Sequence, residues 1–267
     1  MRLKPKTQSP KPKTQKSMNG QIQTSIRNNI GTISFSHPAS NSFPSVLLGR
    51  LVENINRLSD NDNVHVIVLK SEGDRAFCAG ASFDELVAIK TLLDGEKFFS
   101  GFANVINAMR TCKKIIIGRV QGKAVGGGVG IVSACDYVFA LESADIKLSE
   151  LSIGIGPFVI EPAVERKIGL AAFSELTIDA THWQTAYWAQ KKGLFNKVFE
   201  KTREMDTAIE QLASKLASYN IESLVEMKKI FWKNTEHWND LLIQRAKVSG
   251  KLVLSDFTKN ALQKFKK

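Results

Sequence analysis

A cluster of glycines that directly follows an apolar segment, residues 115–120, constrains most strongly how this chain can fold. Gly126, Gly127, Gly128 and Gly130 fill four of five consecutive positions, and a short helical pattern continues to about residue 134. Successive glycines before a helix leave backbone N–H groups unpaired at the positive end of the helix dipole, which stabilises an anion or a developing oxyanion. Close packing of helix on strand needs only one glycine. The cluster therefore indicates a strand–loop–helix unit with an anion site.

Strand and helix patterns alternate over the first 150 residues, and helical patterns dominate thereafter. Residues 22–27 and 30–36 alternate apolar and polar side chains around Asn28-Asn29, which is typical of a hairpin. Hydrophobic periodicity predicts further strands at 64–69, 115–120 and 137–140, and helices at 46–58, 97–111 and in much of the chain after about residue 158. This order predicts an α/β fold, with a core at 21–200 and a C-terminal helical region at 201–267.

A dinucleotide site is an alternative interpretation of the glycine cluster. Ile131 and Ser133 stand where the last glycine of a G-x-G-x-x-G pattern would fall. Glu142 lies near the distance expected for an acid that binds a ribose, although acids are common at such positions. No Gly-Lys-Ser or Gly-Lys-Thr sequence follows, so a P-loop is excluded. An oxyanion site is the favoured hypothesis, and a dinucleotide-dependent enzyme is the alternative.

A second run of small residues, Ala79-Gly80-Ala81, follows the strand expected at 64–69. The carboxyl ends of parallel strands are where α/β proteins bind ligands. Small side chains also let a ligand approach backbone N–H groups closely. On composition alone, a plain strand-to-helix connection explains this run better than a binding site does.

Glu150 is the first candidate for acid–base chemistry, because it lies among apolar residues after a short strand. Burial raises the pKa of a carboxylate and lets it act as a base near neutral pH. A surface glutamate at a helix start is the simpler interpretation of this residue taken alone. Glu161 and Glu165, one helical turn apart, are candidate second acids, although glutamates at this spacing usually face solvent.

Much of the formal net charge of +11 comes from the start of the chain. Residues 1–20 carry six lysines and arginines and no acid, which leaves +5 for the remainder. The prolines and the scarcity of apolar residues predict a disordered basic leader without the apolar core of a secretory signal. We expect no nucleic-acid partner, because the leader has no aromatic side chain to stack on bases. The mildly basic remainder suits an anionic ligand.

Composition excludes several other classes of protein. No run approaches ~18 consecutive apolar residues, so we expect no membrane-spanning helix. Cys78, Cys112 and Cys135 lack C-x-x-C spacing, which indicates buried thiols in a reducing, cytoplasmic setting. The four histidines have no metal-ligand spacing, so no metal is expected, and there is no G-x-S-x-G sequence of a serine hydrolase.

Together these segments resemble the crotonase superfamily, the enoyl-CoA hydratase/isomerase family. Residues 76–81 are similar to its first signature and residues 121–136 to its second, and the likeness runs from about residue 22 to the C-terminus. The resemblance implies a crotonase-type ββα spiral core and a C-terminal α-helical trimerisation region, in a homotrimer or homohexamer. It also implies an acyl-CoA thioester as substrate, no membrane partner, and no cofactor besides the coenzyme A of the substrate.

The resemblance assigns roles to individual residues. It implies that the backbone N–H groups of Ala81 and Gly127 form an oxyanion hole for a thioester enolate and that Glu150 moves the proton. The implied site for coenzyme A and the acyl group consists of Arg75, Ala76, Phe77, Ala79, Gly80, Ser82, Phe83, Gly126, Phe158 and Phe265.

The acid–base residues depart from the family's hydratase pattern. Hydratases of the family use two glutamates; the second matches Glu150, and the first falls on Gly130, which has no side chain. A single glutamate predicts a proton shift between C2 and C4 of an enoyl-CoA, which is double-bond isomerisation. Residues 154–162 also depart from the usual glycine-rich run, so Phe158 reshapes the acyl pocket and Glu161 could restore a second carboxylate. Hydration by Glu150 with another acid, or a non-catalytic acyl-CoA-binding or RNA-associated scaffold, is the alternative.

Overall fold

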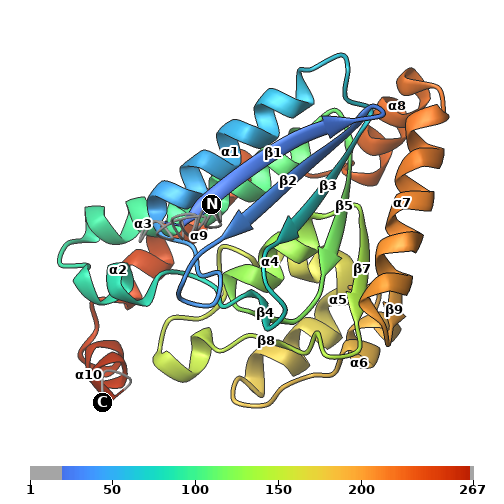
Figure 1. The fold of residues 1–267 in the computed structure, drawn as a ribbon. Helices are drawn as coiled ribbons and strands as arrows, with labels where there is room; N and C mark the ends of the chain where they lie inside the picture. Colours follow the sequence, from blue (N-terminus) through green and yellow to red (C-terminus); the bar gives the residue numbers. More distant parts are fainter. Residues whose placement is uncertain (1–19, 265–267) are drawn as a thin grey trace, which may run out of the picture.

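A six-stranded sheet runs through the computed structural model, which describes residues 20–264 (Figure 1). The strands, in the order β1-β2-β3-β5-β7-β9, are β1 (Gln21–Arg27), β2 (Ile30–Ser36), β3 (Val66–Ser71), β5 (Ile115–Val120), β7 (Tyr137–Leu141) and β9 (Lys197–Phe199). The expected hairpin is confirmed, because β1 and β2 pair antiparallel. From β2 onward the neighbours pair in parallel. The basic leader lies outside the described residues except for Gly20.

A second sheet of three short parallel strands carries the loops of the sequence signatures. Its strands, in the order β4-β6-β8, are β4 (Ala76–Cys78), β6 (Lys123–Val125) and β8 (Ile146–Lys147). Each has two or three residues, too few to show a periodic pattern. Their pairing brings the segments after β4, β6 and β8 to the same edge of this sheet.

Helices surround the two sheets; the helix expected at 46–58 is confirmed, and the one expected at 97–111 begins earlier, at Leu92. They are α1 (Ser45–Ser59), α2 (Phe83–Ala88), α3 (Leu92–Thr111), α4 (Gly127–Ala134), the 3-10 helix η1 (Glu150–Ile153), α5 (Glu161–Ile178), α6 (Ala186–Lys191), α7 (Thr202–Ser218), α8 (Ile221–Phe231), α9 (Trp238–Leu252) and α10 (Asp256–Lys264). The predominantly helical stretch expected after residue 158 is interrupted by β9, which joins the large sheet beside β7.

Alternating side chains divide the core into a layer on each face of the large sheet. In β3, Ile67 and Leu69 belong to the layer formed with α1, α3 and α4, whereas Val66 and Val68 belong to the layer formed with α7. Figure 1 shows α1 and α7 on opposite sides of the sheet. Helix α7 buries one stripe of residues at helical spacing: Met205, Ile209 and Ala213. No helix within residues 20–264 is long and apolar enough to cross a membrane.

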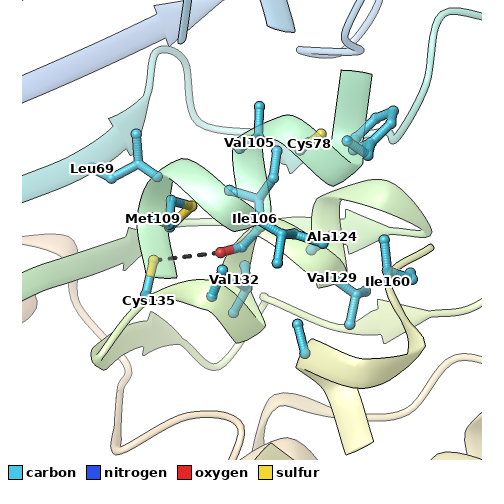
Figure 2. Close-up of a cluster of buried hydrophobic side chains, with 14 of the residues drawn as sticks. Leu69, Cys78, Val105, Ile106, Met109, Ala124, Val129, Val132, Cys135 and Ile160 are labelled. Carbon is cyan, nitrogen blue, oxygen red and sulfur yellow. Dashed lines mark hydrogen bonds between the residues drawn. The ribbon is translucent and has the colours of Figure 1, made fainter. Parts of the chain in front are cut away.

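The three cysteines are free thiols buried in this core, as the sequence predicted. Figure 2 shows Cys78 and Cys135 among aliphatic side chains, with Cys135 Sγ donating to the carbonyl of Ile131 at 3.6 Å. Burial raises the pKa of Cys78 and of Cys135 to about 12. Neither thiol is therefore a nucleophile at neutral pH, which agrees with the structural role expected for Cys78.

Helices α3 and α9 cross in close contact where two glycines meet. A Cβ atom on Gly95 would lie 2.7 Å from Cα of Gly250, so neither position leaves room for a side chain. Helix α3 begins with a capping box, in which Thr91 and Asp94 each accept a hydrogen bond from the other's backbone N–H. The crossing brings α9, near the end of the chain, against the centre of the molecule.

A buried ion pair fixes α8 to the large sheet. Lys228 Nζ lies 2.9 Å from Asp136 Oδ2 and donates to the carbonyl of Lys114 at 2.7 Å. Trp232 Nε1 and the Ile116 backbone N–H donate to the same carboxylate at 2.8 and 2.7 Å. Both charged side chains are only 4% exposed. Because water cannot solvate them, the ion pair and these hydrogen bonds must compensate both charges within the protein.

Candidate functional site

The loops that follow β4 and β6 approach each other closely at Gly80. This residue has a φ of +89°, and a Cβ atom on it would lie 3.0 Å from the carbonyl oxygen of Val125 and 3.7 Å from the amide nitrogen of Gly127. Glycine is needed here both for the left-handed backbone and for the narrow gap. The two runs of small residues in the sequence therefore lie side by side.

A cavity of about 210 Å³ opens where these loops meet. Its walls come from both loops, from η1 and the segment after it, and from α2, α3 and α9. Apolar side chains and backbone form most of the lining: Ala79, Gly80, Ala81, Phe83, Leu86, Phe99, Phe102, Val125, Gly126, Gly127, Ile153, Ile155, Gly156, Pro157, Phe158, Val159 and Ile160. The polar side chains among the described lining residues are those of Ser149, Glu150 and Ser249.

The backbone N–H groups of Ala81 and Gly127 both belong to lining residues, and neither donates a hydrogen bond within residues 20–264. One neighbouring N–H group on each loop is occupied. The Ser82 N–H donates to the Phe43 carbonyl at 3.0 Å, and the Gly126 N–H donates to the Lys147 carbonyl at 2.9 Å. Gly127 is the first residue of α4, so its N–H lies at the positive end of that helix. Both free N–H groups can therefore donate to an oxygen atom bound in the cavity.

Glu150 is the one ionisable side chain among the described lining residues. It begins η1, and its Oε2 is buried without a hydrogen-bond partner within residues 20–264. Desolvation raises the pKa of this carboxyl from its ordinary value of 4.5 to about 7. A hydrogen bond from the residue's own backbone N–H lowers the pKa by a smaller amount. A carboxylate with this pKa can both accept and return a proton near neutral pH.

Each glycine of the cluster makes room for a different neighbour. A Cβ atom on Gly127 would lie 2.5 Å from Cζ of Phe102, and one on Gly128 would lie 2.7 Å from the Cys78 carbonyl oxygen. On Gly130 it would lie 2.7 Å from Cβ of Ile160. The interpretation that packing requires only one glycine was therefore wrong, because three of the four are needed for contacts with neighbouring core residues.

The structure brings together most of the residues expected at the site and leaves others elsewhere. Eight of them line the cavity: Ala79, Gly80, Ala81, Phe83, Gly126, Gly127, Glu150 and Phe158. Phe77 is buried in the core, with its ring 5.4 Å from that of Phe35, and Ser82 caps α2 by accepting from the Glu85 N–H. Ala76 lies within β4 and Arg75 is exposed, neither in the cavity lining. Phe265 lies outside the described residues.

Glu161, the candidate second acid, is not among the residues that line the cavity. Its Oε2 lies 3.2 Å from Nη2 of Arg245 on α9. Burial and a hydrogen bond with Glu165 raise its pKa, and Arg245 opposes that rise. The cavity therefore holds one carboxylate, and Ile160, the residue before Glu161, contributes an aliphatic side chain to the wall instead.

Among the lining residues absent from the predicted site, three come from helices distant in sequence: Phe99 and Phe102 on α3, and Ser249 on α9. They reach the cavity through the packing of α3 and α9, which are about 140 residues apart in the chain. The only feature of the sequence that reflects this helix packing is the pair Gly95 and Gly250, which permits the close crossing of α3 and α9. Two isolated glycines in helical patterns do not predict that contact.

A family model described as enoyl-CoA hydratase/isomerase matches residues 25–266. The short-chain-enoyl-CoA hydratase of Clostridium acetobutylicum is 29% identical over 202 residues, covering 75% of this chain and 76% of the relative. The peroxisomal Δ(3,5)-Δ(2,4)-dienoyl-CoA isomerase of Arabidopsis thaliana is 24% identical over 197 residues, covering 68% and 69%. Among solved structures, an enoyl-CoA hydratase from Bacillus halodurans superposes with a TM-score of 0.85 at 20% identity, covering 91% of this chain and 99% of that one, so the two share a fold.

Proposed function

Since the chain belongs to the enoyl-CoA hydratase/isomerase family and is an enzyme of that type, we propose that it moves a double bond along the acyl chain of an enoyl-CoA thioester. In this proposal the acyl group and the thioester occupy the apolar cavity, and the coenzyme A moiety extends outside it. Glu150 is the acid–base residue, and the Ala81 and Gly127 N–H groups bind the thioester oxygen. The reaction needs no cofactor beyond the coenzyme A of the substrate.

The reaction is a 1,3-proton shift in two steps. The Glu150 carboxylate removes a proton from C2 of a 3-enoyl-CoA, and the electron pair of that C–H bond delocalises onto the thioester oxygen as a dienolate. Donors placed at such an oxyanion typically contribute about 3 kcal/mol each to lowering the barrier. When the carbonyl forms again, C4 takes the proton back from Glu150. The double bond then lies between C2 and C3, and the carboxylate is regenerated.

The observation that carries this proposal is the single carboxylate of the cavity together with the contact between Gly130 and Ile160. Hydration needs one group to orient a water molecule and another to deliver a proton to carbon. At residue 130, where the family's hydratases have their first glutamate, Ile160 fills the space that a side chain would require. One carboxylate suffices for a proton shift, because the same group removes and returns the proton.

The test is product analysis with purified protein. With a 3-enoyl-CoA we expect conversion to the 2-enoyl-CoA and little hydration of the latter. A substrate deuterated at C2 should yield product with part of the label at C4, because one carboxyl group carries it. Glu150→Gln should lower the rate about 100- to 10,000-fold. Rapid hydration of a 2-enoyl-CoA that survives Glu150→Gln would defeat the proposal.

Hydration is the second candidate, and the relatives named as enoyl-CoA hydratases favour it. It would require Glu150 and another acid, and Glu161 is the nearest candidate in sequence. The variant Glu161→Gln separates the two activities. Loss of hydration with retained isomerisation would assign the second acid to Glu161. Tight binding of coenzyme A thioesters without turnover would instead indicate a scaffold.

We further propose a homotrimer or homohexamer in the cytoplasm. Large apolar side chains on α5 and α8 support an interface between subunits, because they are 43–62% exposed in the single chain: Leu170, Met227, Ile230 and Phe231. Sedimentation analysis of the purified protein tests the assembly, and a monomer at micromolar concentration would contradict it.

A further inference from the structure

The Ala81 N–H group is directed into the cavity by a bridge between its loop and residues 40–43. Phe43 and Ala81 form an isolated parallel bridge, in which the Phe43 N–H donates to the Gly80 carbonyl at 2.8 Å. The Ser82 N–H donates to the Phe43 carbonyl at 3.0 Å. In such a bridge the N–H of the middle residue points away from the partner strand. Because Phe43 is buried in the core and Ala81 lines the cavity, the Ala81 N–H points away from the core and toward the cavity.

The residues just before Ala81 are held by hydrogen bonds as well. The Ala79 N–H donates to the Ser40 carbonyl at 3.1 Å, and the Gly80 N–H donates to Cys78 Sγ at 3.3 Å. In the run from Ala79 to residue 82, only the N–H of Ala81 donates to no group within residues 20–264. The position of residues 40–43, which accept two of the other N–H groups, therefore decides where the Ala81 N–H points.

Asn41 anchors residues 40–43 to the rest of the fold. Its side chain is buried; Nδ2 donates to the carbonyls of Glu72 and Ala76, both at 2.8 Å, and Oδ1 accepts from the His37 N–H at 3.0 Å. Glu72 directly follows β3 and Ala76 begins β4, so one side chain binds both ends of the turn between these strands. The bridge described above forms just after β4. Asn41 thus fixes residues 40–43 along this short strand.

Asparagine suits both the backbone conformation and the hydrogen bonds at residue 41. Its φ of +58° is in the left-handed region, which asparagine adopts more readily than most residues. Its amide supplies two donors and an acceptor on one short side chain. Aspartate has the same shape but no donors when ionised, and glycine adopts the same backbone but has no side chain. These two substitutions therefore remove the hydrogen bonds without requiring a new backbone conformation.

We infer that Asn41 is a positioning residue for the reaction, which holds the Ala81 N–H in the direction of the thioester oxygen through residues 40–43. This inference rests on the proposed function, because the direction of that N–H affects a rate only if the oxygen gains charge. Asn41 does not line the cavity, so it acts on the reaction through Ala81. A donor aimed in advance at a developing oxyanion is effective because it need not reorient during the reaction.

Infrared spectroscopy of a bound thioester tests the inference without turnover. Butyryl-CoA labelled with carbon-13 at its carbonyl has no double bond to isomerise, and hydrogen bonds to the carbonyl oxygen lower its stretching frequency. Isotope-edited spectra are recorded for the unmodified full chain, Asn41→Gly, Asn41→Asp and Asn29→Gly. Asn29 is the matched control, because it is an exposed asparagine with a φ of +61° in the turn between β1 and β2. The affinity for butyryl-CoA and kcat with a 3-enoyl-CoA are measured on the same proteins.

In Asn41→Gly we expect about half of the downshift to be lost and kcat to fall about 100-fold, because one of the two donors is misplaced. The affinity for butyryl-CoA should change by less than about 3-fold, since the donor matters most when the oxygen carries charge. Asn41→Asp should behave in the same way near neutral pH. At low pH it should recover part of the downshift, because a protonated carboxyl donates one hydrogen bond, and Asn41→Gly should not. Asn29→Gly should change none of these quantities.

A full downshift in folded Asn41→Gly overturns the inference whatever its kcat, and so does the absence of a downshift in the unmodified protein. Loss of folding in both Asn41 variants, seen by circular dichroism, also overturns it, because the residue then serves only the stability of the fold. The proposed function fails in a different way. If the unmodified protein shows the downshift but isomerises no 3-enoyl-CoA, the proposed function is wrong, and the loss of downshift in Asn41→Gly still shows that Asn41 positions the donor.

Discussion

The carboxylate of Glu150 fills the space beside Gly126. A Cβ atom on Gly126 would lie 2.5 Å from Oε1 and 3.1 Å from Cδ of Glu150, and the glycine has a φ of +51°. Gly126 also precedes α4, whose first residue supplies one of the two free N–H groups. A single glycine therefore sets the positions of the proposed base and of an oxyanion donor at once.

Gly126→Ala should remove activity far more than stability. The positive-φ backbone of Gly126 costs an alanine about 1–3 kcal/mol, and the new methyl group must displace Glu150. Because a misplacement of about 1 Å at a catalytic group lowers rates about 100-fold, we expect at least that loss of kcat. Steady-state kinetics and urea unfolding measure the two effects.

Gly49→Ala is the matched control for that substitution. Gly49 lies in α1 with no atom near the position of a new Cβ and with an ordinary helical backbone. Alanine should raise the free energy of unfolding there by about 0.5–1 kcal/mol. Full activity of Gly126→Ala would show that the glycine does not position Glu150.

The rate of isomerisation should depend on the protonation of Glu150. Only the carboxylate can remove a proton, so kcat/KM should rise with pH through about 7, the raised pKa of this group, and then level off. In Glu150→Gln the rate should fall about 100- to 10,000-fold, and the residual activity should lose this dependence on pH. A rate profile that is flat between pH 5.5 and 8.5 in the unmodified enzyme would contradict Glu150 as the base.

The same raised pKa has a consequence for stability. A carboxyl whose pKa is higher in the folded protein than its ordinary 4.5 binds its proton more tightly when folded, so stability falls as pH rises from about 4.5 to 7. Glu150→Gln removes this penalty. It should be no more stable than the unmodified protein at pH 4 and more stable by an amount on the order of 3 kcal/mol at pH 8. Urea unfolding at the two pH values checks the sign.

The large sheet and the chemical centre could be predicted from the sequence because local patterns carry them. Residues 64–69 and 115–120 are apolar runs, and each run by itself predicts a buried strand. The structure has β3 and β5 there. The run around Ala81 and the glycine cluster were assigned to one site through their resemblance to the two signatures of the crotonase superfamily. Glu150 was first singled out because it lies among apolar neighbours, and its predicted acid–base role came from the same resemblance.

The walls of the cavity could not be predicted, because they arise from contacts between distant segments. Strands β4, β6 and β8 are too short for periodicity, so their pairing becomes visible only in three dimensions. Ser249 enters the cavity because α9 crosses α3, and neither helix shows that contact in its own pattern. Glu161 was a candidate acid by spacing alone, whereas its pairing with Arg245 depends on how α5 meets α9.

The buried pair of Asp136 and Lys228 should be the most costly ion pair to break. Lys228→Met leaves the carboxylate with two hydrogen-bond donors and without its direct ion-pair partner, and removing one partner of a buried pair costs about 3–5 kcal/mol. The neighbouring Lys229→Met is the control, since Lys229 pairs with Glu226 on the surface and should cost less than about 1 kcal/mol. Similar losses in the two variants would show that the buried pair does not fix α8.

The contact between Gly130 and Ile160 should appear as coupling in a double-mutant cycle. Gly130→Ala forces a methyl group against Ile160, and such overpacking costs about 1–3 kcal/mol. Ile160→Ala leaves a gap beside Gly130, and truncations of this kind cost about 2–5 kcal/mol. The double variant places the new methyl group in that gap, so it should be more stable than the sum of the two losses by about 1–2 kcal/mol, within the range measured for residues in contact.

The same cycle connects this packing to the proposed chemistry. Combining Gly130→Glu with Ile160→Gly makes room for a second carboxylate and removes the aliphatic group from the wall. We expect this double variant to gain hydration of a 2-enoyl-CoA above the level of the unmodified enzyme, whereas Gly130→Glu alone, blocked by Ile160, gains none and loses stability. Product analysis and urea unfolding measure the two effects. Equal hydration by the single and double variants would show that Ile160 does not block a carboxylate at residue 130.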